Sequence, residues 1–316
     1  MNKSILIQYL PLSHAKATLR VVRKLGNNGI KAIIDLEDSV QDPFCDDTTN
    51  NLKKNARKNF LDLITSNKFD DKVFKEPIFL RINSTETDYF NDDIETLLEV
   101  CKTKFPLKGV FLPKVEDYSQ VEQLHSLIKN KYSSLEIVPM IETVKGMNNL
   151  KNILTSDENL SLFKYVHYGH FDYALDAGFW PFPDPDHQVF WDIVLSMTKL
   201  VLDYKKIYIH TPFPFMDNKD LFWQASHFLE ENFPNKEIWI CTLNSELSLS
   251  DDNKDSLSIS NLTCSQEESL NQANLIKNDF LNGRANKRSF SVGSNRFIPP
   301  HQYFAALKYL DKNSNN

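Results

Sequence analysis

Short apolar runs alternate strictly with amphipathic helical patterns along this chain, and few folds accept that alternation. Eight runs have the composition of strands buried on both faces, at 4–10, 31–37, 77–83, 109–115, 135–142, 165–171, 206–211 and 237–243. Apolar residues at three- and four-residue spacing predict the helices, at 14–26, 49–66, 90–104, 118–131, 144–155, 187–204, 217–232 and 266–282. Alternation of this kind implies a parallel sheet with right-handed crossovers, and eight repeats imply closure into a (β/α)8 barrel.

The 316 residues suit one barrel of about 250 residues followed by a tail. We expect a barrel domain over 1–245, a polar linker over 246–265 and a C-terminal helical extension over 266–316. A last short helix is expected at 300–311. The alternative is an open doubly wound sheet, but the glycine turn that usually binds a nucleotide after its first strand is missing.

The composition of the chain argues against several classes of function. The chain has only 8 glycines and neither of the glycine-rich phosphate-binding motifs, which argues against a dinucleotide or Walker-type site. A net charge of −6 without a basic block argues against nucleic-acid binding. The four cysteines have no C-x-x-C spacing, and no apolar run approaches the length of about 20 residues that spans a membrane. Residues 1–13 do not resemble a signal peptide, so we expect a cytoplasmic protein without a membrane partner.

Charged and polar residues gather where the predicted strands end. Active sites of β/α barrels lie at the C-terminal ends of the strands. The residues at these ends are Asp35, Glu37, Asp38, Arg81, Asn83, Lys114, Glu116, Glu142, His170, Asp172, His210 and Asn244. So many charges at one barrel mouth are costly unless they are compensated, which favours a functional site over a set of solvated strand ends.

Glu142 and Asp172 follow neighbouring strands and could share one hard divalent cation, which predicts a Mg²⁺ site. The alternative is that one carboxylate forms a structural ion pair. Glu37 and Asp38 could hold metal-bound water. The guanidinium of Arg81 could form bidentate hydrogen bonds with a substrate carboxylate or bind a carbonyl oxygen. Alternatively, Arg81 could form a structural salt bridge with Glu37 inside the barrel.

Several motifs of the chain resemble those of the citrate lyase beta subunit-like (HpcH/HpaI aldolase) family. They occur in the family's order over about 5–245. The matching segments are 35–40 (DLEDSV) with 56–57 (AR), 81–83 (RIN), 112–116 (LPKVE), 141–146 (IETVKG) and 169–178 (GHFDYALDAG). Each motif alone is weak, but together they are specific.

The resemblance implies a (β/α)8 barrel of the phosphoenolpyruvate/pyruvate superfamily. It implies Mg²⁺ held by Glu142 and Asp172, with Arg81 near the substrate oxygens. Members cleave or form C–C bonds next to a carbonyl, often in citryl-, malyl- or other 3-hydroxyacyl-coenzyme A thioesters, and some are thioesterases. They are commonly trimers or hexamers, and in some the base comes from a neighbouring subunit's C-terminal segment.

Two departures weaken the expectation that coenzyme A is used. The family's first strand usually runs into V-P-G-x-R, whereas residues 9–14 read YLPLSH. Its last strand usually ends W-x-x-H-P-x-Q, whereas residues 239–246 read WICTLNSE. Aromatic segments at 179–183 (FWPFP) and 212–215 (PFPF) could form a rim of the site, or could pack on each other or on another subunit.

We therefore expect a Mg²⁺-dependent carbon–carbon lyase or aldolase that acts on a hydroxy or oxo acid, or its thioester, through a metal-stabilised enolate. The candidate catalytic residues are Arg81, Glu37, Asp38 and His170, and the candidate substrate-binding residues are Arg81, Asn83 and Lys114. The general base could be His170, Asp38 or His210. The alternatives are a thioesterase or Claisen-type synthase on the same site, and a non-catalytic barrel subunit. A homo-oligomer is expected.

Overall fold

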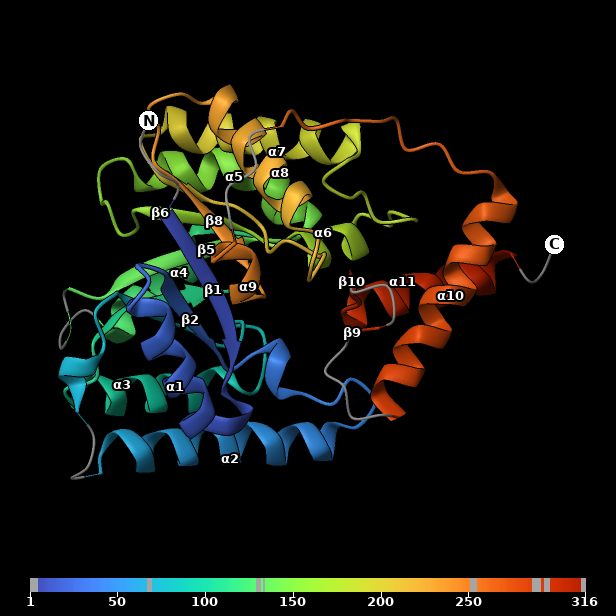
Figure 1. The fold of residues 1–316 in the computed structure, drawn as a ribbon. Helices are drawn as coiled ribbons and strands as arrows, with labels where there is room; N and C mark the ends of the chain where they lie inside the picture. Colours follow the sequence, from blue (N-terminus) through green and yellow to red (C-terminus); the bar gives the residue numbers. More distant parts are fainter. Residues whose placement is uncertain are drawn as a thin grey trace.

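Eight parallel strands close into a barrel (Figure 1), as the sequence predicts. This computed structural model describes residues 5–66, 70–128, 132, 134–250, 255–285, 291–292 and 296–313. The strands are β1 (Ile5–Pro11), β2 (Lys31–Asp35), β3 (Ile78–Arg81), β4 (Leu107–Leu112), β5 (Glu136–Ile141), β6 (Tyr165–Tyr168), β7 (Ile207–Ile209) and β8 (Ile238–Thr242). Each pairs with the next in the chain, and β8 pairs with β1.

Helices follow the strands around the outside of the barrel. They are α1 (Ala15–Gly26), α2 (Asp46–Ile64), α3 (Phe90–Cys101), α4 (Tyr118–Ile128), α5 (Val144–Asp157), α6 (His170–Asp176), α7 (Gln188–Asp203) and α8 (Lys219–Asn232). Short 3-10 turns lie at η1 (Leu12–His14), η2 (Asp38–Val40) and η3 (Asp71–Val73). The sequence pattern missed α6, because β6 was expected to continue to residue 171.

The expectation that 266–282 is the helix paired with the eighth strand is wrong. The helix that follows β8 is the four-residue α9 (Ser245–Ser248). The later helix, α10 (Gln266–Ala285), packs instead against α11 (Pro300–Asn313). Between α9 and α10, Ser260 forms a bridge with His187, and Leu257 and Ile259 pack on the main core.

The barrel interior is packed with apolar side chains, several of which are aromatic. Residues of β1 alternate, so that Leu6 and Leu10 face the outer helices while Ile7 and Tyr9 face inward. Inside, the rings of Tyr165 and Trp239 lie with centroids 4.7 Å apart.

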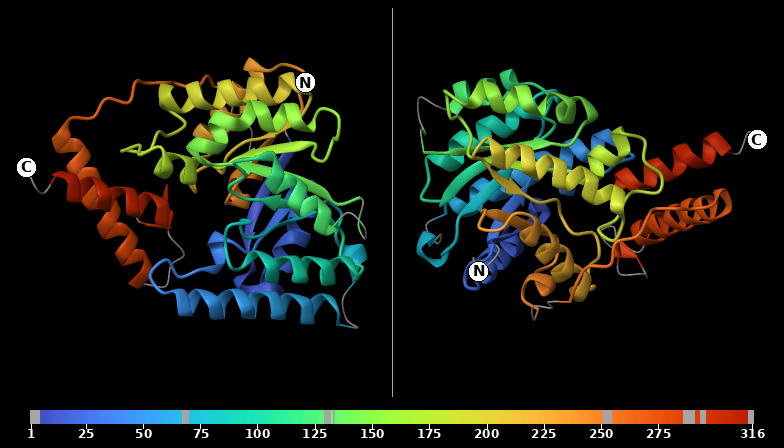
Figure 2. Two further views of the ribbon diagram at one scale, coloured as in Figure 1. Left: turned by 180° about the vertical axis from the view of Figure 1, so that it is seen from behind. Right: turned by 90° about the horizontal axis from the view of Figure 1, so that it is seen from above.

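The C-terminal arm comprises α10, α11 and the hairpin strands β9 (Ser291–Val292) and β10 (Arg296–Phe297). Figures 1 and 2 show the arm at one side of the barrel, with the start of α11 turned toward it. Trp180 contacts the arm twice: its ring packs on Tyr309 and its Nε1 donates to the Ser269 carbonyl over 3.1 Å. The arm is thereby anchored to the loop that follows α6. Among the described residues, no helix is both long and apolar enough to cross a membrane.

Candidate active site

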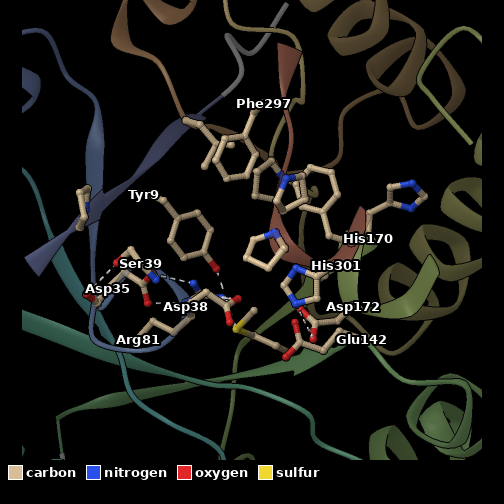
Figure 3. Close-up of a pocket in the computed structure, with 18 of the residues that line it drawn as sticks. Tyr9, Asp35, Asp38, Ser39, Arg81, Glu142, His170, Asp172, Phe297 and His301 are labelled. Atoms are coloured by element: carbon tan, nitrogen blue, oxygen red, sulfur yellow. Dashed lines mark hydrogen bonds and ion pairs between the residues drawn. The ribbon is translucent and has the colours of Figure 1, made fainter. Parts of the chain in front are cut away.

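A cavity of about 290 Å³ lies at the C-terminal ends of the strands. Figure 3 shows Asp35, Asp38 and Arg81 on one side of it and Glu142, Asp172 and His301 on the other, with Tyr9 between the two groups. The beginning of α11 and the segment before it complete the wall with Phe297, Pro299, Pro300 and His301. The strand ends and the arm therefore build the cavity together.

Arg81 is held by carboxylates at one side of the cavity. Its Nε and Nη2 donate to the two oxygens of Asp35 over 2.6 and 2.7 Å. Its Nη1 lies 2.8 Å from Glu37 Oε2 and 3.3 Å from Asp38 Oδ2. The guanidinium also lies 4.8 Å from the centre of the Tyr9 ring. Three of the five N–H groups of Arg81 are hydrogen-bonded to Asp35 and Asp38, and the contact with Glu37 is an ion pair.

The pairing of β2 with β3 and the turn after β2 explain why these carboxylates surround Arg81. Asp35 and Arg81 are directly paired in the β2–β3 register. Asp35 also accepts hydrogen bonds from the backbone N–H groups of Glu37 and Ser39, which holds the turn that carries Asp38. The salt bridge from Arg81 to Glu37, one of the two sequence interpretations, is present. Asp35 was named among the strand-end residues but was given no role, because its sequence position alone does not reveal that it fixes Arg81.

Glu142 and Asp172 lie side by side across the cavity from Arg81 (Figure 3). Glu142 Oε1 accepts the Lys114 backbone N–H over 2.9 Å, and Lys114 Nζ lies 3.2 Å from Asp172 Oδ1. Lys114 adopts a φ of 54°, a left-handed conformation that is uncommon for a non-glycine residue, in the turn that makes both contacts. A Cβ at Gly169 would collide with the Glu142 carboxylate, so this motif glycine is required by close packing.

The charges around Glu142 and Asp172 favour the binding of a cation. Burial, and then the charges of Asp172 and Glu37, raise the pKa of Glu142 well above its ordinary value. Burial also opposes ionisation of Asp172, but His301 and Lys114 outweigh it and lower the pKa of that carboxyl. Burial and Asp38 raise the pKa of Glu37 to about 8. For both glutamates, burial and the neighbouring carboxylates outweigh the stabilising charges of Arg81 and Lys114, so a further cation would stabilise their ionised forms.

The residues fit a bound Mg²⁺. The network contains the carboxyl groups of Asp35, Glu37, Asp38, Glu142 and Asp172 against the cationic groups of Arg81, Lys114 and His301. A surplus of buried carboxylate oxygens is the donor set that hard divalent cations prefer. Glu142 and Asp172 could therefore hold the ion. The ligand atoms of Asp38, Asp172 and His301, within 4.8 Å of one another, are a second possible group.

His301 is a site residue that the sequence did not identify. Its Nε2 lies 3.2 Å from Asp172 Oδ1, and burial, which would lower its pKa, is outweighed by Asp172, which raises the pKa to about 9. The family resemblance named the C-terminal segment of a neighbouring subunit, without a residue, whereas His301 belongs to the same chain as Asp172. The local sequence pattern of the arm does not reveal where α11 docks.

Asn83 and His170 have other partners. Asn83 accepts from Lys53 Nζ over 2.8 Å, donates to Asp93 over 2.6 Å and does not line the cavity. Its assignment to substrate binding remains a prediction without a contact to support it.

His170 lines the cavity, but its Nε2 lies 2.8 Å from the Pro183 carbonyl and its Nδ1 lies 3.0 Å from the Tyr168 hydroxyl. With both ring nitrogens engaged, His170 is poorly placed to act as the general base.

His210 lies outside the residues that line the cavity. Its ring stacks on Trp191 with centroids 6.1 Å apart, and its Nδ1 lies 3.4 Å from the Tyr208 hydroxyl. Burial, with a smaller contribution from His167 and His170, lowers its pKa to about 3. The geometry therefore favours a structural role for this histidine.

This burial predicts acid sensitivity. Because the folded pKa of His210 lies below the unfolded value of about 6.5, its stabilising effect is complete above pH 6.5 and decreases as the pH falls toward 3. The loss amounts to about 2 kcal/mol at pH 5. Urea unfolding of His210→Phe at pH 8 and pH 5 should show a drop in unfolding free energy that is smaller than the wild-type drop by about that amount. An equal drop in both proteins would refute the assignment.

The first aromatic segment packs on α6 and on the arm, and the second packs on α8. Phe182 packs with Ala174 and Ala305, and Phe213 lies 5.4 Å from Phe222. The aromatic wall of the cavity is instead formed by Phe171 and Phe297, whose ring centroids are 5.9 Å apart. Of the two segments predicted to form a rim, 179–183 therefore supports the docked arm.

Comparisons with known proteins agree with the fold and the motifs. The family model of the HpcH/HpaI aldolase/citrate lyase proteins matches residues 8–201. A citrate lyase subunit beta-like protein of Deinococcus radiodurans is 28% identical over 101 residues, which cover 32% of this chain and 32% of that protein. The match thus spans about a third of the length of this relative.

Solved structures share the fold at low sequence identity. RipC from Yersinia pestis is 19% identical with a TM-score of 0.54, over 78% of this chain and 91% of that one. The CitE protein from Mycobacterium tuberculosis in complex with magnesium, acetoacetate and coenzyme A is 14% identical with a TM-score of 0.58, over 98% and 99%. The citrate lyase beta subunit from the same organism, complexed with oxaloacetate and magnesium, is 16% identical with a TM-score of 0.54, over 76% and 92%.

Proposed function

Because the chain belongs to the HpcH/HpaI aldolase/citrate lyase family, we propose that it is a Mg²⁺-dependent carbon–carbon lyase or aldolase. The substrate is a small hydroxy or oxo acid, or the acyl part of its thioester. The observation that carries this proposal is the placement of Glu142 and Asp172 opposite Arg81 around one cavity of about 290 Å³. The relatives complexed with magnesium and small oxo acids support it as analogies.

The chemistry requires stabilisation of negative charge next to a carbonyl. A bound Mg²⁺ would supply a Lewis acid for the negative charge that develops next to the carbonyl. Glu142 and Asp172 would hold the ion, and Lys114 orients both carboxylates through its backbone N–H and its ammonium group. An N–H of Arg81 that is not bonded to Asp35 or Asp38 donates to a substrate oxygen, and the two hydrogen bonds to Asp35 keep the guanidinium in place for this contact.

A proton must be taken from the substrate hydroxyl in the cleavage direction. We assign this step to Asp38, one of the predicted bases. Its carboxylate lines the cavity, lies 3.3 Å from Arg81 Nη1 and accepts from Gln41 Nε2 over 3.1 Å. Phe297 and Pro299 of the arm cover the same space and limit the access of water to it.

Calorimetry with Mg²⁺ and with pyruvate, oxalate or glyoxylate tests the proposal. We expect Mg²⁺ to bind, and at least one acid to bind more tightly when Mg²⁺ is present. Product analysis should then detect a carbonyl fragment released by cleavage of a C–C bond. Release of free thiol from a thioester without such cleavage would indicate a thioesterase instead. Failure of every acid and of Mg²⁺ to bind would indicate a non-catalytic barrel.

A further inference from the structure

Lys53, on α2, is a buried lysine that is bonded to the backbone of the turn after β2. It is 1% exposed, and its Nζ donates over 2.8 Å to each of three oxygens. These oxygens are the backbone carbonyls of Leu36 and Glu37 and the Oδ1 of Asn83. An amine nitrogen has three N–H groups only as an ammonium, so this geometry requires the charged form of Lys53. None of the three acceptors is a carboxylate.

A network of buried groups keeps Lys53 and its acceptors in place. Asn83 donates to Asp93 Oδ2 over 2.6 Å from its side chain and over 2.7 Å from its backbone N–H. Asp93 in turn accepts from Arg57 Nε over 2.7 Å. The ring of Tyr89 lies next to the ammonium, with 5.1 Å between Nζ and the ring centre. The network therefore ties the end of β3 and the turn after β2 to α2 and α3.

The turn that Lys53 holds leads directly to Asp38. Glu37 has a φ of −89° and a ψ of −105°, which are the angles of neither a helix nor a strand. The carbonyl groups of Leu36 and Glu37 both reach the same ammonium in this conformation. On the opposite side of the turn, Asp35 accepts the backbone N–H of Glu37 over 2.9 Å. The backbone before Asp38 is thus fixed through its N–H and its carbonyl groups.

We propose that Lys53 is a positioning residue for the proton transfer assigned to Asp38. This role rests on the proposed function, in which Asp38 takes the proton of a substrate hydroxyl. Lys53 does not line the cavity, so it acts through the turn. Without Lys53 the chemical step slows, because a base must lie within hydrogen-bond reach of the proton that it takes. Binding of the cation and the acid at Glu142, Asp172 and Arg81 is retained.

Lys53→Met tests this role, since it keeps an unbranched side chain but removes the charge and the three N–H groups. Turnover is measured on the acid that product analysis identifies, or as the condensation of pyruvate with glyoxylate. In that reaction the methyl carbon of pyruvate loses a proton and bonds to the aldehyde carbon, and the aldehyde oxygen gains a proton. We expect kcat to fall about 100-fold. The KM, and the affinities for Mg²⁺ and oxalate in calorimetry, should stay within about threefold of the wild-type values.

Chemical rescue distinguishes positioning from damage to the fold. Lys53→Ala leaves space for propylammonium, which replaces the missing end of the side chain and should raise kcat at least about tenfold. Propanol, which has a single donor, should not. Lys206→Met is the control for stability, because Lys206 is largely buried and contacts Asp157 and the Phe163 carbonyl, but does not line the cavity. It should unfold more easily and keep kcat within about threefold of the wild-type value.

The outcomes separate this role from the proposed function. An unchanged kcat in folded Lys53→Met would overturn the role. A loss of kcat that comes with an equal loss of Mg²⁺ and oxalate affinity, or that propylammonium does not reverse in Lys53→Ala, would also overturn it. Lys53→Gln retains two N–H groups, so it should show the same split with a smaller loss, and it decides the question if Lys53→Met does not fold. Absence of carbon–carbon turnover in the wild-type protein would overturn the proposed function and this role with it.

Discussion

Glu142→Gln and Asp172→Asn should each weaken Mg²⁺ binding about 100-fold or more and reduce turnover about 1000-fold. Each substitution removes one negative charge and one anionic ligand from the cation site. Glu142→Gln should fold normally, because its amide oxygen still accepts the Lys114 N–H and the buried charge is lost. Calorimetric titration with Mg²⁺, together with steady-state kinetics, would measure both effects.

Glu116→Gln is the matched control. It makes the same chemical change at the end of the neighbouring strand, but Glu116 forms an ion pair with Lys145 over 2.8 Å and does not line the cavity. Its Mg²⁺ affinity and turnover should remain within about twofold of the wild-type values. Equal Mg²⁺ binding in the Glu142, Asp172 and Glu116 variants would remove the basis of the proposed function.

The barrel could be predicted from the sequence because the patterns of its strands and helices are local and repeat along the chain. Each strand is a short run of apolar residues, and the helices between strands show the spacing of one buried face. The position of the cavity followed from a general property of this fold, since charged residues recur at the strand ends that meet at the mouth. The boundary at β6 was misjudged because residues 165–171 (YVHYGHF) carry rings or a β-branched side chain at every position except Gly169, which separates the strand from α6.

What the sequence could not predict depends on contacts between distant segments. His301 reaches Asp172 only because α11 docks on α6, and that docking depends on Trp180 and its partners in the arm. Lys53 likewise contacts the turn after β2 only because α2 packs against that turn. Neither position has a spacing pattern that would reveal its contacts.

Arg81→Met should destabilise the protein by about 3–5 kcal/mol and abolish detectable binding of the acid. The substitution leaves the Asp35 carboxylate, which is buried and accepts two of the guanidinium's N–H groups, without its counter-charge. Glu37, whose pKa is already raised, loses its 2.8 Å ion pair at the same time. Urea unfolding would measure the loss of stability, and calorimetry with the acid and Mg²⁺ would measure the loss of binding at a temperature where the variant is folded.

Arg57→Met is the control that separates the loss of stability from the loss of acid binding. Arg57 is also buried and donates to the buried Asp93 over 2.7 Å, but it lies outside the cavity. It should lose a comparable free energy of unfolding and retain acid binding wherever it is folded. In Arg81→Met with Asp35→Asn, stability should recover in part because a buried charge is removed with its partner, whereas acid binding should not recover. Retained acid binding in Arg81→Met would mean that the guanidinium only holds Asp35 and Glu37 in place, and that the substrate oxygens bind elsewhere in the cavity.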